Sequence, residues 1–122
     1  MADSTTPDAK QLLASKCVPC EGGVPVLSKE VATERLRAVP SWKLDEEAKS
    51  ISLKLNCGNF VAAVSTINVV SEIAESQQHH PDLHLTGYRH LKIVLTTHAI
   101  GGLSENDLIV AAHIDRAINE KD

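Results

Sequence analysis

The apolar residues of this chain change their spacing along the sequence, from the three-to-four-residue spacing of an amphipathic helix to the strict alternation of a strand and back. Helical spacing is found between residues 28 and 39, 59 and 78, and 104 and 118. Two alternating segments separate each helical segment from the next. This order predicts an α+β fold, helix-strand-strand-helix-strand-strand-helix, in which a four-stranded antiparallel sheet carries the helices on one face.

Each helical segment is preceded by a residue suited to cap its N-terminus. Ser28, Asn59 and Ser104 occupy these positions, and their side chains accept bonds from helix amides that otherwise lack a partner. Pro40 and Pro81 end the first two segments because proline does not continue helical bonding. We expect the following apolar residues to face the sheet: Ala32, Leu36 and Val39; Phe60, Val64, Ile67, Val70 and Ala74; Val110, Ala111, Ile114, Ala117 and Ile118.

The alternating segments predict two hairpins with one buried face each. In the first hairpin, Trp42 and Leu44 are separated from the next strand by a charged turn over residues 45–49. In the second, the strands are joined through Gly87 and Tyr88. The other apolar strand positions are Ile51, Leu53, Leu55, Leu83, Leu85, Leu91, Ile93 and Leu95.

Residues 1–27 are rich in Ser, Thr, Pro and Gly and show no sustained period. We expect them to form an extension that is partly disordered up to Gly22-Gly23, followed by one ordered domain over residues 28–122. Cys17 and Cys20 form a pair in this extension, but a zinc site needs four ligands and the chain has no second pair. The three cysteines therefore fit free thiols in a reducing compartment.

The composition limits the classes of function. A chain of 122 residues is long enough for one domain with a single core. Its net charge of −4 and its scattered Lys and Arg residues argue against a direct nucleic-acid surface. Because no apolar run approaches the ~20 residues of a membrane span and residues 1–10 are polar, we expect no membrane association. The expected location is cytoplasmic, or an organelle if a targeting segment has been removed.

The titratable side chains are concentrated between Glu75 and Asp107. Five of the six histidines lie at positions 79 to 98, and histidine is the side chain that both donates and accepts protons near neutral pH. Trp42 and Tyr88 are two of only three aromatic residues, which suggests that they line a site for a flat ligand. This region therefore predicts acid–base chemistry.

The spacing of these residues resembles the signature of the pterin-4a-carbinolamine dehydratases. The matching positions are Glu75, three residues, His79-His80-Pro81, six residues, Tyr88, nine residues, His98, eight residues and Asp107. The resemblance covers roughly residues 28–119. It implies the fold predicted above and a lyase that removes water from a 4a-hydroxytetrahydropterin, without a metal or organic cofactor.

The resemblance also implies the roles of the site residues. His79 and His98 are expected to form the acid–base pair, and His80 is expected to bind the pterin within the same catalytic group. The division of roles among the three histidines stays open. Glu75, Trp42, Tyr88 and Asp107 are expected in the substrate-binding part of the site, with Glu75 tuning a histidine and Asp107 at the pocket rim. Because Glu75 is four residues before His79 on the same helical face, these two side chains are expected to pair.

Structural explanations exist for the same residues. His79 and His80 could cap carbonyls at a helix end, and Glu75 could be an exposed carboxylate that makes an ordinary helix pair. Trp42 could fill the core. Asp107 could close a capping box by accepting from the Ser104 amide. Three further histidines outside the signature are expected to be solvated or hydrogen-bonded, the first two on the polar face of the strands: His84, His90 and His113.

Two other functions fit parts of the sequence. A metal hydrolase could use His79, His80, His84 and His98 as ligands, but adjacent histidines rarely share one ion. The chain could also be a binding or assembly partner, since some proteins that resemble it act as dimerisation cofactors of a homeodomain transcription factor or as plastid assembly helpers. The clustered histidines favour catalysis over that role.

The long helix carries apolar residues beyond a single face. Val61, Val69 and Ile73 widen its apolar arc, and soluble monomers usually avoid exposing such a patch. We therefore expect a homodimer or homotetramer.

Overall fold

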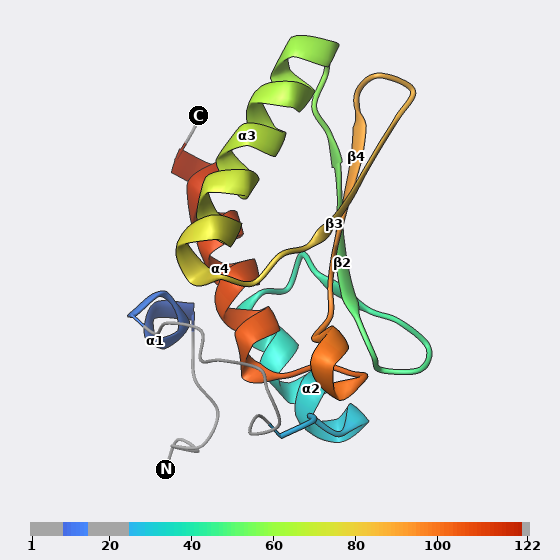
Figure 1. The fold of residues 1–122 in the computed structure, drawn as a ribbon, viewed down its shortest axis with the longest axis vertical. Coiled ribbons are helices and arrows are strands. Elements are labelled where there is room, and N and C mark those ends of the chain that lie inside the picture. The colour runs from blue at the N-terminus through green and yellow to red at the C-terminus, as the bar shows by residue number, and fades with distance from the viewer. Residues whose placement is uncertain (1–8, 15–24, 121–122) are drawn as a thin grey trace.

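The computed structural model of the chain describes residues 9–14 and 25–120 and confirms the α+β fold (Figure 1). Four antiparallel strands form one sheet in the order β1-β2-β4-β3. Helices α3 and α4 lie side by side on one side of this sheet. The strands are β1 Lys43–Leu44, β2 Ile51–Asn56, β3 Asp82–Thr86 and β4 His90–Leu95.

The predicted helices and their caps are confirmed. Ser28 accepts from the Val31 amide before α2 (Lys29–Arg35), which continues as the 3-10 turn η1 (Leu36–Ala38). Asn59 caps α3 (Phe60–Gln77) by accepting from the Ala62 amide. A second 3-10 turn, η2 (His98–Ile100), precedes α4 (Glu105–Glu120).

The core lies between the sheet and the helices. β2 pairs with β4 along its whole length, from Ile51 opposite Leu95 to Asn56 opposite His90, so the apolar residues of both strands point the same way. They meet the buried side of α4. Fully buried residues of this core include Ile51, Leu91, Ile93, Leu95, Leu103, Leu108, Val110 and Ile114.

The predicted inner face of α3 is partly wrong. Phe60 and Val64 are exposed, whereas Ala63 and Thr66 are buried together with the predicted Val70 and Ala74. Alanine and threonine contribute little to an apolar periodicity, but their small size lets the helix approach its neighbours closely. Ile73, expected outside the core, packs against it.

The sequence did not predict helix α1 (Ala9–Ala14). Leu12 of α1 is buried in the core cluster and α1 packs against α4. Six residues are too few to show a helical period, so only the tertiary contact reveals this element. The expectations for free thiols at Cys17 and Cys20, and for an extension that ends at Gly22-Gly23, concern residues outside the described part of the chain.

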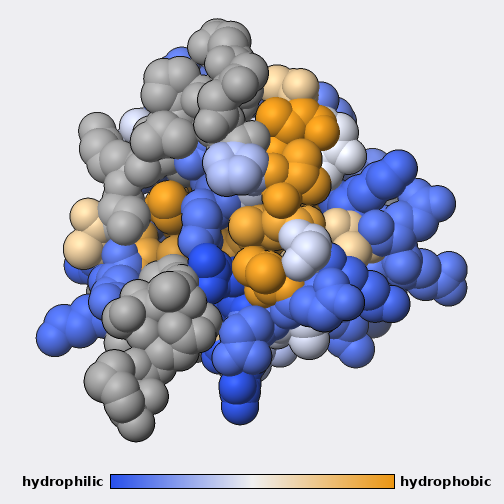
Figure 2. All heavy atoms as spheres, turned by 90° about the horizontal axis from the view of Figure 1, so that it is seen from below, coloured by the Kyte–Doolittle hydropathy of each residue, from blue (hydrophilic) through white to orange (hydrophobic). Residues whose placement is uncertain are grey.

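Apolar surface remains exposed on more than one face. Phe60, Val61 and Val64 are exposed at the start of α3, with Val61 77% accessible. Seen from below, apolar side chains also gather in a band flanked by hydrophilic residues (Figure 2). No helix among the described residues is long and apolar enough to cross a membrane.

Candidate active site

The end of α3 turns His79 toward the protein interior. Gln78 adopts a left-handed conformation, with φ of 55°, and its amide bonds to the Ala74 and Glu75 carbonyls. The His79 amide also donates to the Ala74 carbonyl, at 3.1 Å. These bonds satisfy carbonyls at the helix end and reverse the chain. The His79 side chain is consequently buried, with 7% of its surface accessible.

His79 binds a carboxylate that the sequence places 28 residues away. Its Nε2 atom lies 2.6 Å from Oδ1 of Asp107, in the first turn of α4. The Asp107 side chain is fully buried. A short contact between a histidine and a buried carboxylate fixes the orientation of the imidazole ring.

The second oxygen of Asp107 is held by the loop before α4. Oδ2 accepts from the Ser104 amide at 3.0 Å and from the Thr97 hydroxyl at 2.8 Å. The first bond is the predicted capping box, so Asp107 is both a cap and the partner of His79. Because the single Thr97 hydroxyl proton points to Asp107, the Ser104 hydroxyl donates to Thr97 Oγ1, at 2.8 Å. Ser104 Oγ in turn accepts from the Asn106 amide.

His98 is displayed at the surface beside this network. It directly follows Thr97 and opens η2, and its side chain is exposed. Two backbone bonds between Thr97 and Gly102 close the loop that carries it. Gly101 takes the left-handed conformation that this tight loop requires, with φ of 70°. The loop therefore fixes the backbone of His98, which directly follows Thr97, the residue whose hydroxyl donates to Asp107.

His80 points away from His79 and pairs with Glu75. Its Nε2 atom lies 2.7 Å from the Glu75 carboxylate, and both side chains are more than half exposed. The expected pairing of Glu75 with His79 is therefore wrong. The four-residue spacing would join them only in a continuous helix, but α3 ends at Gln77. The expectation that the two adjacent histidines take different directions is confirmed.

The structure does not bring Trp42 or Tyr88 to this cluster. Trp42 is 3% exposed in the core, and its indole Nε1 donates to Asp115 of α4 at 2.8 Å. That burial matches the core-filling alternative and leaves no ring face open for stacking. Tyr88 is in the loop between β3 and β4, at the top of Figure 1, whereas η2 and the start of α4 are near the bottom. Its ring is next to the guanidinium of Arg89.

The other histidines occupy two different environments. His84 and His90 are exposed on the sheet, as expected. The expectation for His113 is wrong, because its Nε2 atom is buried and has no hydrogen-bond partner within the described part of the chain. Among residues 9–14 and 25–120, no three His, Cys, Asp or Glu side chains are grouped so that they could hold a metal ion.

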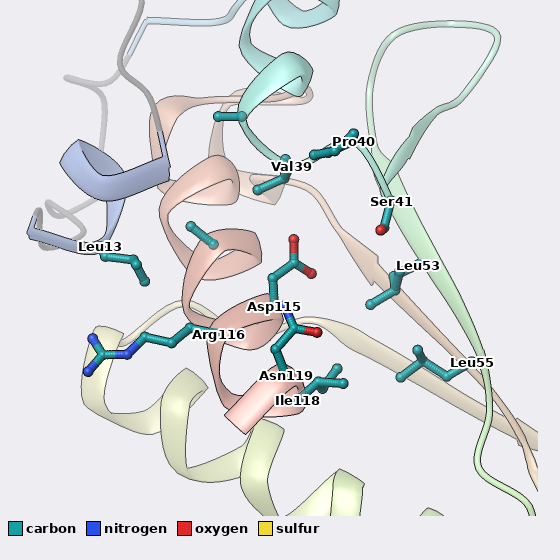
Figure 3. A pocket seen from close by; sticks show the side chains of 12 residues that line it. Leu13, Val39, Pro40, Ser41, Leu53, Leu55, Asp115, Arg116, Ile118 and Asn119 are labelled. Carbon is teal, nitrogen blue, oxygen red and sulfur yellow. The ribbon is translucent and has the colours of Figure 1, made fainter. Parts of the chain in front are cut away.

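A separate cavity of about 420 Å³ lies between α4, β2 and the segment after η1 (Figure 3). Leu13 of α1 lines one side, and the side chains of Val39, Leu53 and Asp115 point into the space. Burial raises the pKa of the Asp115 carboxyl above its ordinary value of 3.8, and the bond from Trp42 opposes the rise. Sequence reasoning missed Asp115, although it directly follows Ile114 of the predicted apolar stripe.

Comparison with known proteins identifies the family. A family model described as pterin 4 alpha carbinolamine dehydratase matches residues 25–117. The chain belongs to this family. The predicted enzyme class, a hydro-lyase, agrees with the names of its relatives.

Curated relatives of the dehydratase family cover most of the chain. A protein of Halorhodospira halophila, provisionally named a pterin-4-alpha-carbinolamine dehydratase, is 44% identical over 99 residues, which are 81% of this chain and 90% of that protein. A protein of Arabidopsis thaliana, named pterin-4-alpha-carbinolamine dehydratase 2, mitochondrial, is 39% identical over 107 residues, covering 85% of this chain and 57% of its own.

A solved structure shares the dehydratase fold. The crystal structure of a transcriptional coactivator/pterin dehydratase from Brucella melitensis superposes with a TM-score of 0.69. The match covers 75% of this chain and 97% of that one, at 24% sequence identity. It confirms the predicted four-stranded α+β fold.

Proposed function

We propose that this protein removes water from a 4a-hydroxytetrahydropterin, giving a quinonoid dihydropterin for tetrahydropterin recycling. The observation that carries the proposal is the buried contact of 2.6 Å between His79 and Asp107, beside the loop that displays His98. A buried imidazole oriented by a carboxylate is suited to proton transfer. Membership of the dehydratase family supports the choice of substrate class.

The reaction requires two proton transfers. One proton is delivered to the 4a-hydroxyl, which leaves as water, and one is withdrawn from the pterin ring system. A positioned acid or base typically accelerates such a step ~10²–10⁴-fold. His79 and His98 take these two roles in our proposal.

His80 and Glu75 are proposed to contact the substrate. Their pair is exposed at the end of α3, directly next to His79 in sequence. An exposed pair of this kind contributes little to folding stability. The pair can therefore break at little cost, and each of its groups can bind the substrate instead. Trp42 and Tyr88 have no part in this proposal because Trp42 is buried against Asp115 and Tyr88 is in the loop between β3 and β4, away from η2 and the start of α4.

A direct assay tests the proposed reaction. The 4a-carbinolamine would be generated chemically and its loss followed by stopped-flow absorbance. We expect the protein to accelerate dehydration, and His79→Ala to lose at least ~10²-fold of that acceleration. His84→Ala, which removes an exposed histidine of β3, is the matched control and should keep full activity. Dehydration at the uncatalysed rate with folded protein would reject the proposal.

We also propose that the protein is a homodimer or homotetramer. Phe60, Val61 and Val64 form an exposed apolar patch at the start of α3, which we call the α3 patch. Strand β3 is in addition an edge of the sheet, with backbone groups free to pair with a second chain. Both features favour association of copies.

The location of the protein stays a prediction. We propose the cytoplasm, with an organelle as the alternative that the name of the Arabidopsis relative raises. Imaging of the native, uncleaved protein in its own cells distinguishes the two.

A further inference from the structure

One side of the sheet carries its own group of polar side chains. In the strand register, Lys54 of β2 is opposite Lys92 of β4, and Lys92 is opposite His84 of β3. Residues paired across antiparallel strands point to the same face, so these three form one row. The adjacent row, two residues along each strand, contains Asn56, His90 and Thr86.

These six residues are all exposed. They point away from the side of the sheet that α3 and α4 cover in Figure 1. We call this surface the open sheet face. It is separate from the His79–Asp107 cluster, so no residue of the proposed active site contributes to it.

The charges of the open sheet face are unbalanced. Lys54 and Lys92 are directly opposite each other, an arrangement that destabilises a sheet through like-charge repulsion. Neither lysine makes an ion pair with a described residue. Lys43 of β1 is also on this face, opposite Ser52, and Asp82 is the one acidic residue at its strand positions. Because the whole chain has a net charge of −4, general basicity does not explain this positive surface.

The open sheet face is also hollowed. A cavity of about 480 Å³ is lined by Lys54, Leu55, Asn56, His84, Thr86, His90, Leu91 and Lys92. This volume is within the usual range for small-molecule sites. Its rim combines two ammonium groups with imidazole, amide and hydroxyl donors, and the side chains of Leu55 and Leu91 point from the strands to the core on the other face. This is a donor set for an anion, and the aliphatic stems of the two lysines and the imidazole rings offer apolar contact to an organic group attached to it.

We propose that the open sheet face binds a small metabolite through a phosphate monoester. A phosphate carries nearly two negative charges at neutral pH, which matches the two opposed lysines better than a single carboxylate does. The Thr86 hydroxyl and the Asn56 amide supply neutral donors to its oxygens. A small ligand fits better than a nucleic acid, because the remaining Lys and Arg residues do not extend this patch into a continuous basic track.

The test is an NMR titration of the ¹⁵N-labelled full chain with inorganic phosphate and with phenyl phosphate at constant ionic strength. We expect saturable amide shifts in residues 54–56, 84–86 and 90–92, with phenyl phosphate binding more tightly than phosphate because its ring packs on the lysine stems and the imidazole rings. Lys54→Gln with Lys92→Gln should weaken binding at least tenfold. The matched control, Lys29→Gln with Lys49→Gln, makes the same change in charge elsewhere on the surface and should change binding less than twofold.

Several results would overturn the proposal: shifts that do not saturate, shifts confined to other residues, or equal weakening in the two double variants. If a single-stranded oligonucleotide binds to the same β-strands more tightly than phenyl phosphate does, the open sheet face is a nucleic-acid site instead. The dehydratase rate should be unchanged in both double variants, because they leave the histidine cluster intact. If the first variant loses its dispersed spectrum, Lys92→Gln alone should still weaken phosphate binding at least threefold.

Discussion

His79 and Asp107 are joined at 2.6 Å between two helix termini that the sequence separates by 28 residues. The same carboxylate caps α4 through the Ser104 amide and accepts the Thr97 hydroxyl. The position of the imidazole is therefore coupled to the start of α4. A change at either end is expected to affect both the stability of the fold and the chemistry of the site.

Asp107→Asn should change the tautomer of His79. The new amide must keep its oxygen toward Ser104 and Thr97, so its NH₂ group faces His79 Nε2, which then has to accept. The proton of the neutral ring moves to Nδ1. We expect kcat to fall ~10²–10⁴-fold, as for other histidines held in the wrong tautomer. Long-range ¹H–¹⁵N spectra of the imidazole identify the tautomer, and an unchanged Nε2–H form would contradict this account.

Thr97→Val removes a positioning hydroxyl while keeping the shape of the side chain. Asp107 loses one donor and the buried Ser104 hydroxyl loses its acceptor, which should cost about 1–3 kcal/mol of folding stability. We expect kcat to fall more than KM changes, because Asp107 no longer holds the His79 ring in the same way. Thr97→Ser should restore both quantities. Thr33→Val, at an exposed position of α2, is the control and should alter neither.

His98→Ala should leave the fold intact and reduce dehydration at least ~10²-fold, because an exposed side chain is removed and the core is unchanged. Circular dichroism and the steady-state rate are the measurements. Normal kinetics in a folded variant would show that His98 has no part in the reaction.

Asp115 should make stability depend on pH. Its pKa is raised by burial, so the folded state binds more protons than the unfolded state between pH 3.8 and the folded pKa. Stability therefore falls as pH rises through that window, and the penalty stays at higher pH. Asp115→Asn keeps an acceptor for Trp42 and should flatten this dependence.

Asp115→Ala leaves the indole N–H of Trp42 unpaired and should lose about 1–3 kcal/mol of folding stability. Thermal melts from pH 3 to 8 measure both effects.

Val61→Glu should dissociate the proposed homo-oligomer. Val61 is the most exposed residue of the α3 patch, and a carboxylate there would be buried against an apolar partner or repelled by its own copy. Sedimentation velocity at micromolar concentration should show a shift to smaller species. Thr33→Glu adds the same charge to another exposed helix position and should leave the mass unchanged. If the unmodified protein is already a monomer, the α3 patch does not mediate self-association.

The sequence by itself determined the elements from α2 to α4 and their order, but not helix α1. In β2 and β4 every second side chain points to the same face, and in α4 every third or fourth does. These spacings are local, so they can be read from the sequence without knowledge of the tertiary structure. The cap at Ser104 and its bond to Asp107 are local as well, because both residues belong to one helical turn. The histidine cluster was visible for the same reason, since its signature is a set of spacings along the chain.

Only the tertiary structure decided which of these side chains meet. Gln78 adopts a left-handed conformation that is usual for glycine, and no sequence signal marked it. That one residue turns His79 inward to Asp107 and leaves His80 outside with Glu75. Trp42 is buried in the core, where its indole donates to Asp115, 73 residues later in the chain. Contacts over such separations follow from how the helices pack on the sheet, and local spacing carries no information about that packing.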